Sequence, residues 1–305
     1  MSAAQSEPLA QAGWALVRAG NPRGAMRQFK DALAADPENT NALAGLAQVH
    51  LNLDELNLAE EAAGDLVRVA PNGATGHRVR AEILRRRNRP YEAAKVAREA
   101  VGLDPREPLG YHILAMCSSD QKENKAAIAI CDQGLAVAPA SSVLLAQRAD
   151  NLLELRGPKA AEANIEEALR ISPDSEYVLR VAARIALAQN QLERTRDLLS
   201  IILRRNANNR AAVSLFLMAE PERHRILRGL YIFRYWRKEN GVLGWATYLG
   251  VWAVFIVVAL LLALVTNVAG LLLGVGVRFF LKSQYDAHAR EVQAHFAKFA
   301  LSGGF

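Results

Sequence analysis

The feature that most constrains this chain of 305 residues is a ladder of five prolines at positions 37, 71, 105, 139 and 173, each 34 residues after the last. Each proline follows a helix-like stretch, as in Leu103-Asp104-Pro105. Because proline cannot continue a helix and disfavours helical geometry in the residue before it, each one marks the end of a helix. A fixed period of 34 residues is typical of stacked helix–turn–helix units. The ladder therefore predicts an all-α solenoid.

Small side chains recur in the same register as the prolines. If each proline is position 32 of a 34-residue unit, the units begin at residues 6, 40, 74, 108 and 142. Position 8 is then glycine or alanine in every unit, and position 20 is alanine in every unit. We expect the two helices of a unit to approach closely at these positions, because a larger side chain would hold them apart.

This pattern resembles the tetratricopeptide repeat (TPR) family over roughly residues 6–207. The resemblance implies an α-solenoid of paired helices, with five clear repeats. A sixth unit begins near Glu176 and is degenerate, since it has Thr195 at position 20 and Ala207 in place of proline. We expect a capping helix around Asn208–Met218, because terminal repeats must end the stacked core. The predicted solenoid domain is residues 1–220.

The resemblance also implies a binding surface. In this family the first helices of the units line a concave groove, and positions 2, 5, 9, 12 and 13 face a bound peptide. Transferred to this sequence, positions 5, 9, 12 and 13 give these candidate groove residues: Trp14, Gln48, Arg78, Glu82, Arg85, Arg86, His112, Met116, Asp150, Arg180 and Arg184. The partners implied are other proteins or peptides.

Arginines dominate the candidate groove, in an Arg78/Arg85/Arg86 cluster and an Arg180/Arg184 pair. Arginine suits bidentate capture of carboxylates, so one interpretation is a site for an acidic peptide. The other is a solvated face on which the arginines pair with acidic residues of the repeats, namely Glu82, Asp150 and Glu154. The sequence leaves both open.

The chain beyond residue 220 has a different character. Residues 1–220 hold 27 basic and 27 acidic side chains, whereas residues 221–305 hold 10 basic and 4 acidic, so the net charge of +6 lies there. No charged residue occurs between Glu239 and Arg278. A helix of about 20 apolar residues spans the bilayer core of about 30 Å, and the densest part, Trp245–Val265, is long enough. We predict a transmembrane region at 241–281 that forms one span or a hairpin.

Basic residues flank this region, and they predict its orientation. The basic juxtamembrane linker at 221–240 includes Arg234, Arg237 and Lys238, which place the repeats on the cytoplasmic side by the positive-inside rule. Because the basic excess adjoins the apolar run, we expect the lipid bilayer as its partner and no nucleic acid. Gly270 and Gly274 have the small-xxx-small spacing that allows membrane helices to self-associate. We expect residues 282–305 to form an amphipathic tail.

Sequence signatures of catalysis are absent: the chain has no G-x-S-x-G, no Walker A, no H-E-x-x-H and no C-x-x-C motif. We therefore expect no enzymatic activity, no cofactor and no metal site. The predicted function is a TPR scaffold or adaptor anchored in a bacterial inner membrane, with its repeats in the cytoplasm. The alternative is an accessory subunit of a membrane transport or secretion complex, in which the transmembrane segment is the functional part.

Overall fold

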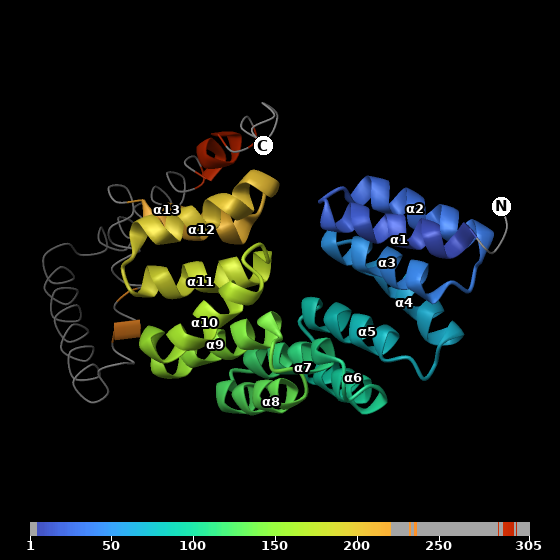
Figure 1. Ribbon diagram of the computed structural model, residues 1–305, viewed down its shortest axis with the longest axis horizontal. Helices are drawn as coiled ribbons and strands as arrows, with labels where there is room; N and C mark the ends of the chain where they lie inside the picture. Colours follow the sequence, from blue (N-terminus) through green and yellow to red (C-terminus); the bar gives the residue numbers. More distant parts are fainter. Residues whose placement is uncertain are drawn as a thin grey trace, which may run out of the picture. The chain divides into compact units, whose positions relative to one another are not determined.

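A computed structural model describes residues 5–220 continuously, together with residues 232, 235, 236, 286, 289–295 and 297. Thirteen α-helices lie within residues 5–220, and all of that part is helix, turn or loop. The predicted all-α repeat array is therefore confirmed over these residues (Figure 1). The predicted transmembrane region at 241–281 lies outside the described residues.

The helices follow the 34-residue register. The first helices of the units are α1 (Ser6–Arg18), α3 (Thr40–Asn52), α5 (Ala74–Arg86), α7 (Pro108–Asp120), α9 (Ser142–Arg156) and α11 (Glu176–Ala188). The second helices are α2 (Pro22–Ala35), α4 (Leu56–Val69), α6 (Pro90–Leu103), α8 (Asn124–Val137), α10 (Pro158–Ile171) and α12 (Leu192–Arg205). The last helix, α13 (Arg210–Ala219), lies where the capping helix is predicted. Each first helix begins at position 1 of its unit, as the proline ladder predicts.

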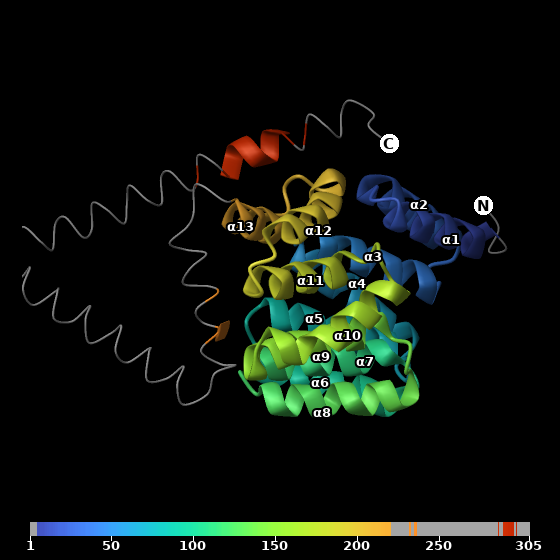
Figure 2. The same ribbon diagram turned by 60° about the vertical axis from the view of Figure 1, so that its left-hand side comes forward.

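The chain divides into two compact units, Met1–Arg148 and Ala149–Phe305, and the boundary falls inside α9. In the first unit, each helix packs against the next, and α1, α3, α5 and α7 also pack side by side (Figures 1 and 2). In the second unit, α11 packs against both α12 and α13. Because α1 packs on α3, α3 on α5 and α5 on α7, these four helices form one continuous face of the first unit.

In each 34-residue repeat, the core is built around small side chains at positions 8 and 20. Positions 8 and 20 are buried in every unit: Gly13, Ala47, Ala81, Ala115, Ala149 and Ala183 at the first, and Ala25, Ala59, Ala93, Ala127, Ala161 and Thr195 at the second. Thr195 fits the degenerate unit because its hydroxyl donates to the carbonyl of Gln191 at 2.8 Å. A buried hydroxyl with such a bond carries no unsatisfied polar group.

Phe29 shows how closely the first repeats are packed. Its ring is fully buried, and a Cβ added to Gly13 would lie 2.5 Å from the ring. A Cβ on Gly45 of the next repeat would lie 2.2 Å from the ring. Both distances are far inside normal contact, so this aromatic side chain fits only because a glycine stands on each side of it.

The turn inside each unit ends the first helix in a repeated way. Position 15 has a left-handed backbone in most units, with φ values of 72° at Gly20, 62° at Asp54 and 59° at Asn88. At Gly20 the two amides that follow the helix return to it, since Gly20 N donates to Val17 O and Asn21 N to Leu16 O. These are the two bonds of a Schellman cap. The fifth unit differs because α9 is longer and Gly157, at φ 95°, makes the turn directly before Pro158.

The turns between units explain the proline ladder. The residue before each proline ends the second helix with φ between −129° and −148° and ψ between 74° and 99°, and Asp36 is the most extended of them. Proline enforces this geometry on its predecessor. Asn206 adopts the same geometry before Ala207, so the sixth unit keeps the turn after losing the proline. There, Asn206 Oδ1 accepts a bond from the amide of Asn208 at 3.1 Å and holds the turn by a side chain.

A short piece of the predicted tail packs on the second unit. Residues 289–295 are helical, and Val292 is buried in one cluster with Leu179, Leu203 and Val213 of α11, α12 and α13. The sequence predicts an amphipathic tail here. Its apolar side chain at Val292 is covered by the last repeat.

Candidate functional site

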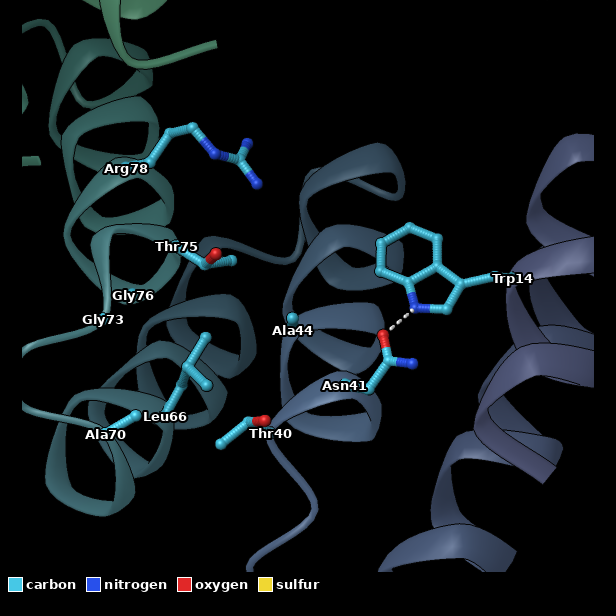
Figure 3. Close-up of a pocket in the computed structure, with 10 residues that line it drawn as sticks. All are labelled: Trp14, Thr40, Asn41, Ala44, Leu66, Ala70, Gly73, Thr75, Gly76 and Arg78. Atoms are coloured by element: carbon cyan, nitrogen blue, oxygen red, sulfur yellow. Dashed lines mark hydrogen bonds between the residues drawn. The ribbon is translucent and has the colours of Figure 1, made fainter. Parts of the chain in front are cut away.

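A pocket of about 450 Å³ opens in the first unit on the side of the first helices. Figure 3 shows Trp14 of α1 and Arg78 of α5 on opposite sides of Ala44, which comes from α3. The lining residues are Trp14, Thr40, Asn41, Ala44, Leu66, Ala70, Gly73, Thr75, Gly76 and Arg78. Two of the predicted groove residues, Trp14 and Arg78, are thus brought to one pocket by the stacking of three repeats.

The indole of Trp14 is held in one orientation. Its Nε1 donates to Asn41 Oδ1 at 2.8 Å, and Asn41 Nδ2 donates to Glu7 Oε1 at 2.9 Å. The ring also packs edge-on against Phe29, with 5.6 Å between ring centroids. Because the indole is fixed by a hydrogen bond and an aromatic contact, the pocket has a rigid wall in the absence of any ligand.

Arg78 supplies a positive charge on the other side. Its Nε is buried and, within the described part of the chain, makes no hydrogen bond. The ion pair that it forms there is long, with 3.9 Å between Nε and Glu107 Oε2. Glu107 is itself occupied, because its Oε2 accepts the amide of Gly110 at 3.0 Å and caps α7. A buried guanidinium N–H without a hydrogen bond is costly, and the long ion pair with Glu107 offsets this cost only in part.

Part of this pocket could be predicted from the sequence. Asn41 and Thr75 stand at position 2 of their repeats, a position that the family resemblance places on the ligand side. Leu66, Ala70 and Gly73 come instead from the end of α4 and the turn after it. No first-helix position names them, so only the three-dimensional packing shows that they line the pocket.

Arg85 and Arg86 belong to a separate network. Both donate to Glu82, with Arg85 Nε at 2.8 Å and Arg86 Nε at 2.8 Å from its two oxygens. Arg85 Nη1 also bonds Asp120 at 3.1 Å, and Arg86 Nη1 bonds the carbonyl of Leu51 at 2.7 Å. Burial alone would raise the pKa of Glu82, but the bonds and charges of the two arginines hold it below its ordinary value. These arginines are paired with acids of the repeats, and the pairs are largely withdrawn from solvent, since the Glu82 side chain is 13% exposed and the Arg85 side chain 19%.

The second unit contains another charged group. Arg184 pairs through Nη1 with Asp150 and through Nη2 with Glu154, the latter at 2.8 Å. The hydroxyl of Tyr235 donates to Glu154 Oε1 at 2.7 Å. Removal from solvent raises the pKa of Asp150, against the opposing charges of Arg184 and Arg180. Arg180 lies over the ring of Tyr177, 5.2 Å from its centroid.

The other candidate groove residues make contacts of their own. Gln48 donates to Asn52 at 3.0 Å on the same helix. Met116 packs against the buried cluster of Ala93, Ala97 and Ile113. His112 is half-buried on α7. The candidate residues therefore form three places of different chemistry: the Trp14/Arg78 pocket, the Glu82 network and the group around Arg184.

The described residues offer little for covalent chemistry. Burial raises the pKa of the Cys117 thiol and of the Cys131 thiol to about 12 each, so neither is a thiolate at neutral pH. Within residues 5–220 and the few described beyond them, no three histidine, cysteine or acidic side chains gather as metal ligands would.

The transmembrane region is predicted at residues 241–281, which lie outside the described part of the chain. Among the helices that the structure describes, none combines the length and the apolar character required to cross a bilayer. Arg234, Arg237, Lys238, Gly270 and Gly274 all lie outside the described residues. The one-span and hairpin alternatives stay predictions.

Comparisons with known proteins agree with the helical array. The model of the tetratricopeptide repeat family matches residues 16–83, which include α2, α3 and α4 entire. A comparison with curated proteins found no match. Proteins built from these repeats are typically non-catalytic scaffolds for protein–protein interaction, which agrees with the absence of catalytic motifs.

Solved structures share the fold. A thermophilic TPR protein of Thermus thermophilus is 23% identical, covering 58% of this chain and 97% of its own, with a TM-score of 0.53. A TPR protein from Parabacteroides merdae is 17% identical, covering 70% and 84%, with a TM-score of 0.56. PilW, described as a widely conserved type IV pilus biogenesis factor, is 20% identical, covering 69% and 97%, with a TM-score of 0.51. At these identities the likeness establishes the fold alone.

Proposed function

We propose that this tetratricopeptide-repeat protein is a membrane-tethered scaffold that binds a segment of another protein in the Trp14/Arg78 pocket. The observation that supports this is the pocket itself, which is lined by the fixed indole of Trp14 and by Arg78, whose Nε makes no hydrogen bond to any described residue. Trp and Arg are the side chains most enriched among residues that dominate binding energy. The small Ala44 between them leaves room for a ligand.

The chemistry of the pocket indicates the kind of ligand. Trp14 is partly exposed and offers apolar surface for an aliphatic or aromatic side chain, and it packs against the buried Ala44 and Leu66. Arg78 offers parallel N–H donors that match a carboxylate. The ligand is therefore a peptide segment with an apolar residue close to an Asp, a Glu or a terminal carboxylate.

The test uses two arginines of α5. Peptides selected by display against the full chain in lipid nanodiscs are measured against Arg78→Gln and Arg80→Gln. Arg80 is exposed and does not line the pocket, so the second variant has the same charge change on the same helix. We expect Arg78→Gln to weaken binding about tenfold or more, because a charged hydrogen bond contributes about 1.5–3 kcal/mol. Equal losses in both variants would contradict a specific pocket and leave only general charge attraction.

Membrane tethering is the part of the proposal that rests on sequence alone. Its support is the uncharged run between Glu239 and Arg278 and the basic residues before it. We place the protein in a bacterial inner membrane with its repeats in the cytoplasm. After alkaline carbonate extraction, the full chain should stay with the membranes, and a variant lacking residues 241–281 should be released. Release of the full chain would contradict the tether.

The number of spans is tested by labelling. A Ser302→Cys variant, on a Cys117→Ala/Cys131→Ala background, reports the side of the tail. Replacement of residues 241–281 by an unrelated single span then distinguishes a tethered scaffold from an accessory subunit of a transport or secretion complex. A scaffold should keep its activity after the replacement, and a transport subunit should lose it.

A further inference from the structure

Tyr235 makes an unusual contact for a residue of the predicted juxtamembrane linker. Its side chain is fully buried. Its hydroxyl donates to Glu154 Oε1 at 2.7 Å and accepts from Arg184 Nη2 at 3.4 Å. These partners are 81 and 51 residues away in sequence, so the contact comes from tertiary docking.

The residues that receive Tyr235 stand at ligand positions of the repeat. Asp150 and Glu154 are positions 9 and 13 of the fifth repeat, and Arg184 is position 9 of the sixth. Arg184 joins the two acids, through Nη1 to Asp150 and through Nη2 to Glu154. We call these three side chains the Glu154–Arg184 site. Arg184 pairs with both acids, and Arg180 also acts on Asp150, so the acids already have cationic partners in the second unit.

A phenol hydroxyl suits the Glu154–Arg184 site because it donates one hydrogen bond and accepts another. A carboxylate accepts only, a guanidinium donates only, and a tyrosine hydroxyl does both. A phenylalanine in the same place would remove both the bond that Glu154 Oε1 accepts and the bond that Arg184 Nη2 donates to the hydroxyl. A buried polar group that loses its partner is costly, which makes the hydroxyl the specific feature of the contact.

We propose that the Glu154–Arg184 site is a second peptide-binding site, selective for a tyrosine, and that its ligand is this chain's own segment carrying Tyr235. The site lies wholly in the second unit and does not depend on the Trp14/Arg78 pocket. Tyr235 stands shortly before the uncharged run that begins after Glu239. In the sequence, Tyr235 therefore stands between the repeats and the predicted membrane region, and a tyrosine peptide from another source has to displace its side chain in order to bind.

The experiment supplies the segment in trans. A fluorescent peptide of residues 228–242 is titrated into the full chain in nanodiscs, as wild type and as Tyr235→Ala. We expect the peptide to bind the Tyr235→Ala chain at least tenfold more tightly than the wild type, because only the variant has lost the intrachain occupant. The same peptide with phenylalanine at position 235 should bind the variant about tenfold more weakly or worse.

Three controls make the result specific. The phenylalanine peptide has the same charge as the parent, so a difference between the two does not reflect the basic residues. Trp236→Ala changes the exposed neighbour of Tyr235, and this chain should behave as the wild type. Glu154→Gln, added to Tyr235→Ala, removes the charged acceptor with little change in shape and should abolish tight binding. Circular dichroism checks that each variant is folded.

The proposal fails on either of two outcomes. One is equal binding of the peptide to the wild-type and Tyr235→Ala chains, which means that Tyr235 does not occupy the site. The other is equal binding of the tyrosine and phenylalanine peptides, which means that the hydroxyl does not contribute to binding. Neither outcome bears on the Arg78→Gln comparison, so the two proposals stand or fall separately.

Discussion

Arg78 and Arg85 show how two arginines of one helix can have different roles. Arg85 is committed to Glu82 and Asp120 by three hydrogen bonds, and its pKa is raised above its ordinary value by these acids despite burial. Arg78 has one long ion pair and a buried Nε without a hydrogen bond in the described part of the chain. Composition cannot distinguish them. The difference lies in which acids are within reach: Arg85 has Glu82 of its own helix and Asp120 of the next repeat, whereas Arg78 has Glu107 at 3.9 Å.

The Glu82 network makes a prediction about acid stability. The folded-state pKa of Glu82 is lowered, so its contribution to stability is present above its ordinary pKa near 4.5 and is lost as the pH falls through the folded value. Glu82→Gln should cost about 1.5–3 kcal/mol at pH 7, because two arginines lose a charged acceptor. Urea unfolding followed by circular dichroism should show a smaller loss of stability in the variant than in the wild type as the pH falls below 4.5. A parallel pH dependence in the two proteins would contradict this account.

The Phe29 contact makes a second prediction at the residue scale. Gly45→Ala should destabilise the chain by about 1–3 kcal/mol, because the new methyl group overlaps the ring and Gly13 closes the opposite side. In a Phe29→Ala background the same change should be neutral or stabilising, since alanine favours the helix and the ring is gone. A double-mutant cycle by urea unfolding measures this coupling. Additive effects would show that the overlap relaxes without cost.

At the scale of elements, the helices and their ends could be predicted from the sequence. Proline at position 32 restricts the preceding residue, small side chains mark the helix contacts, and together they fix where each helix begins. The tight turn at Gly157 escaped this reasoning, because the fifth unit keeps its length while α9 extends through position 15. The 34-residue period does not show that one helix is longer and the following turn correspondingly shorter.

Two glycines of the first repeats give a matched test of the turn geometry. Gly20 has φ 72° and open space around its Cα, so Gly20→Ala meets backbone strain without a clash. We expect a loss of about 1–2 kcal/mol. Gly64 also has open space but lies inside α4, so Gly64→Ala should stabilise by about 0.5–1 kcal/mol. Urea unfolding of both variants measures the two signs, and a stabilising Gly20→Ala would contradict the left-handed cap.

At the scale of the whole molecule, the sites were harder to predict than the fold. The family resemblance names Trp14 and Arg78 singly, but their shared pocket depends on Leu66 and Gly73, which lie outside the first helices. The contact of Tyr235 with Glu154 joins residues 81 apart across the end of the repeat register. A 34-residue period carries no information about a segment beyond the array, so only the structure shows this contact.

The most direct test of the scaffold's binding pocket is to map where a selected ligand touches the chain. A peptide selected against the full chain, with a photoreactive group at its apolar residue, is crosslinked in nanodiscs, and the modified residues are identified by mass spectrometry. Our account predicts crosslinks to α1, α3 and α5 and to the turn after α4, and their suppression by Arg78→Gln but not by Arg80→Gln. Crosslinks confined to the exposed faces of α2, α4 and α6 would contradict it.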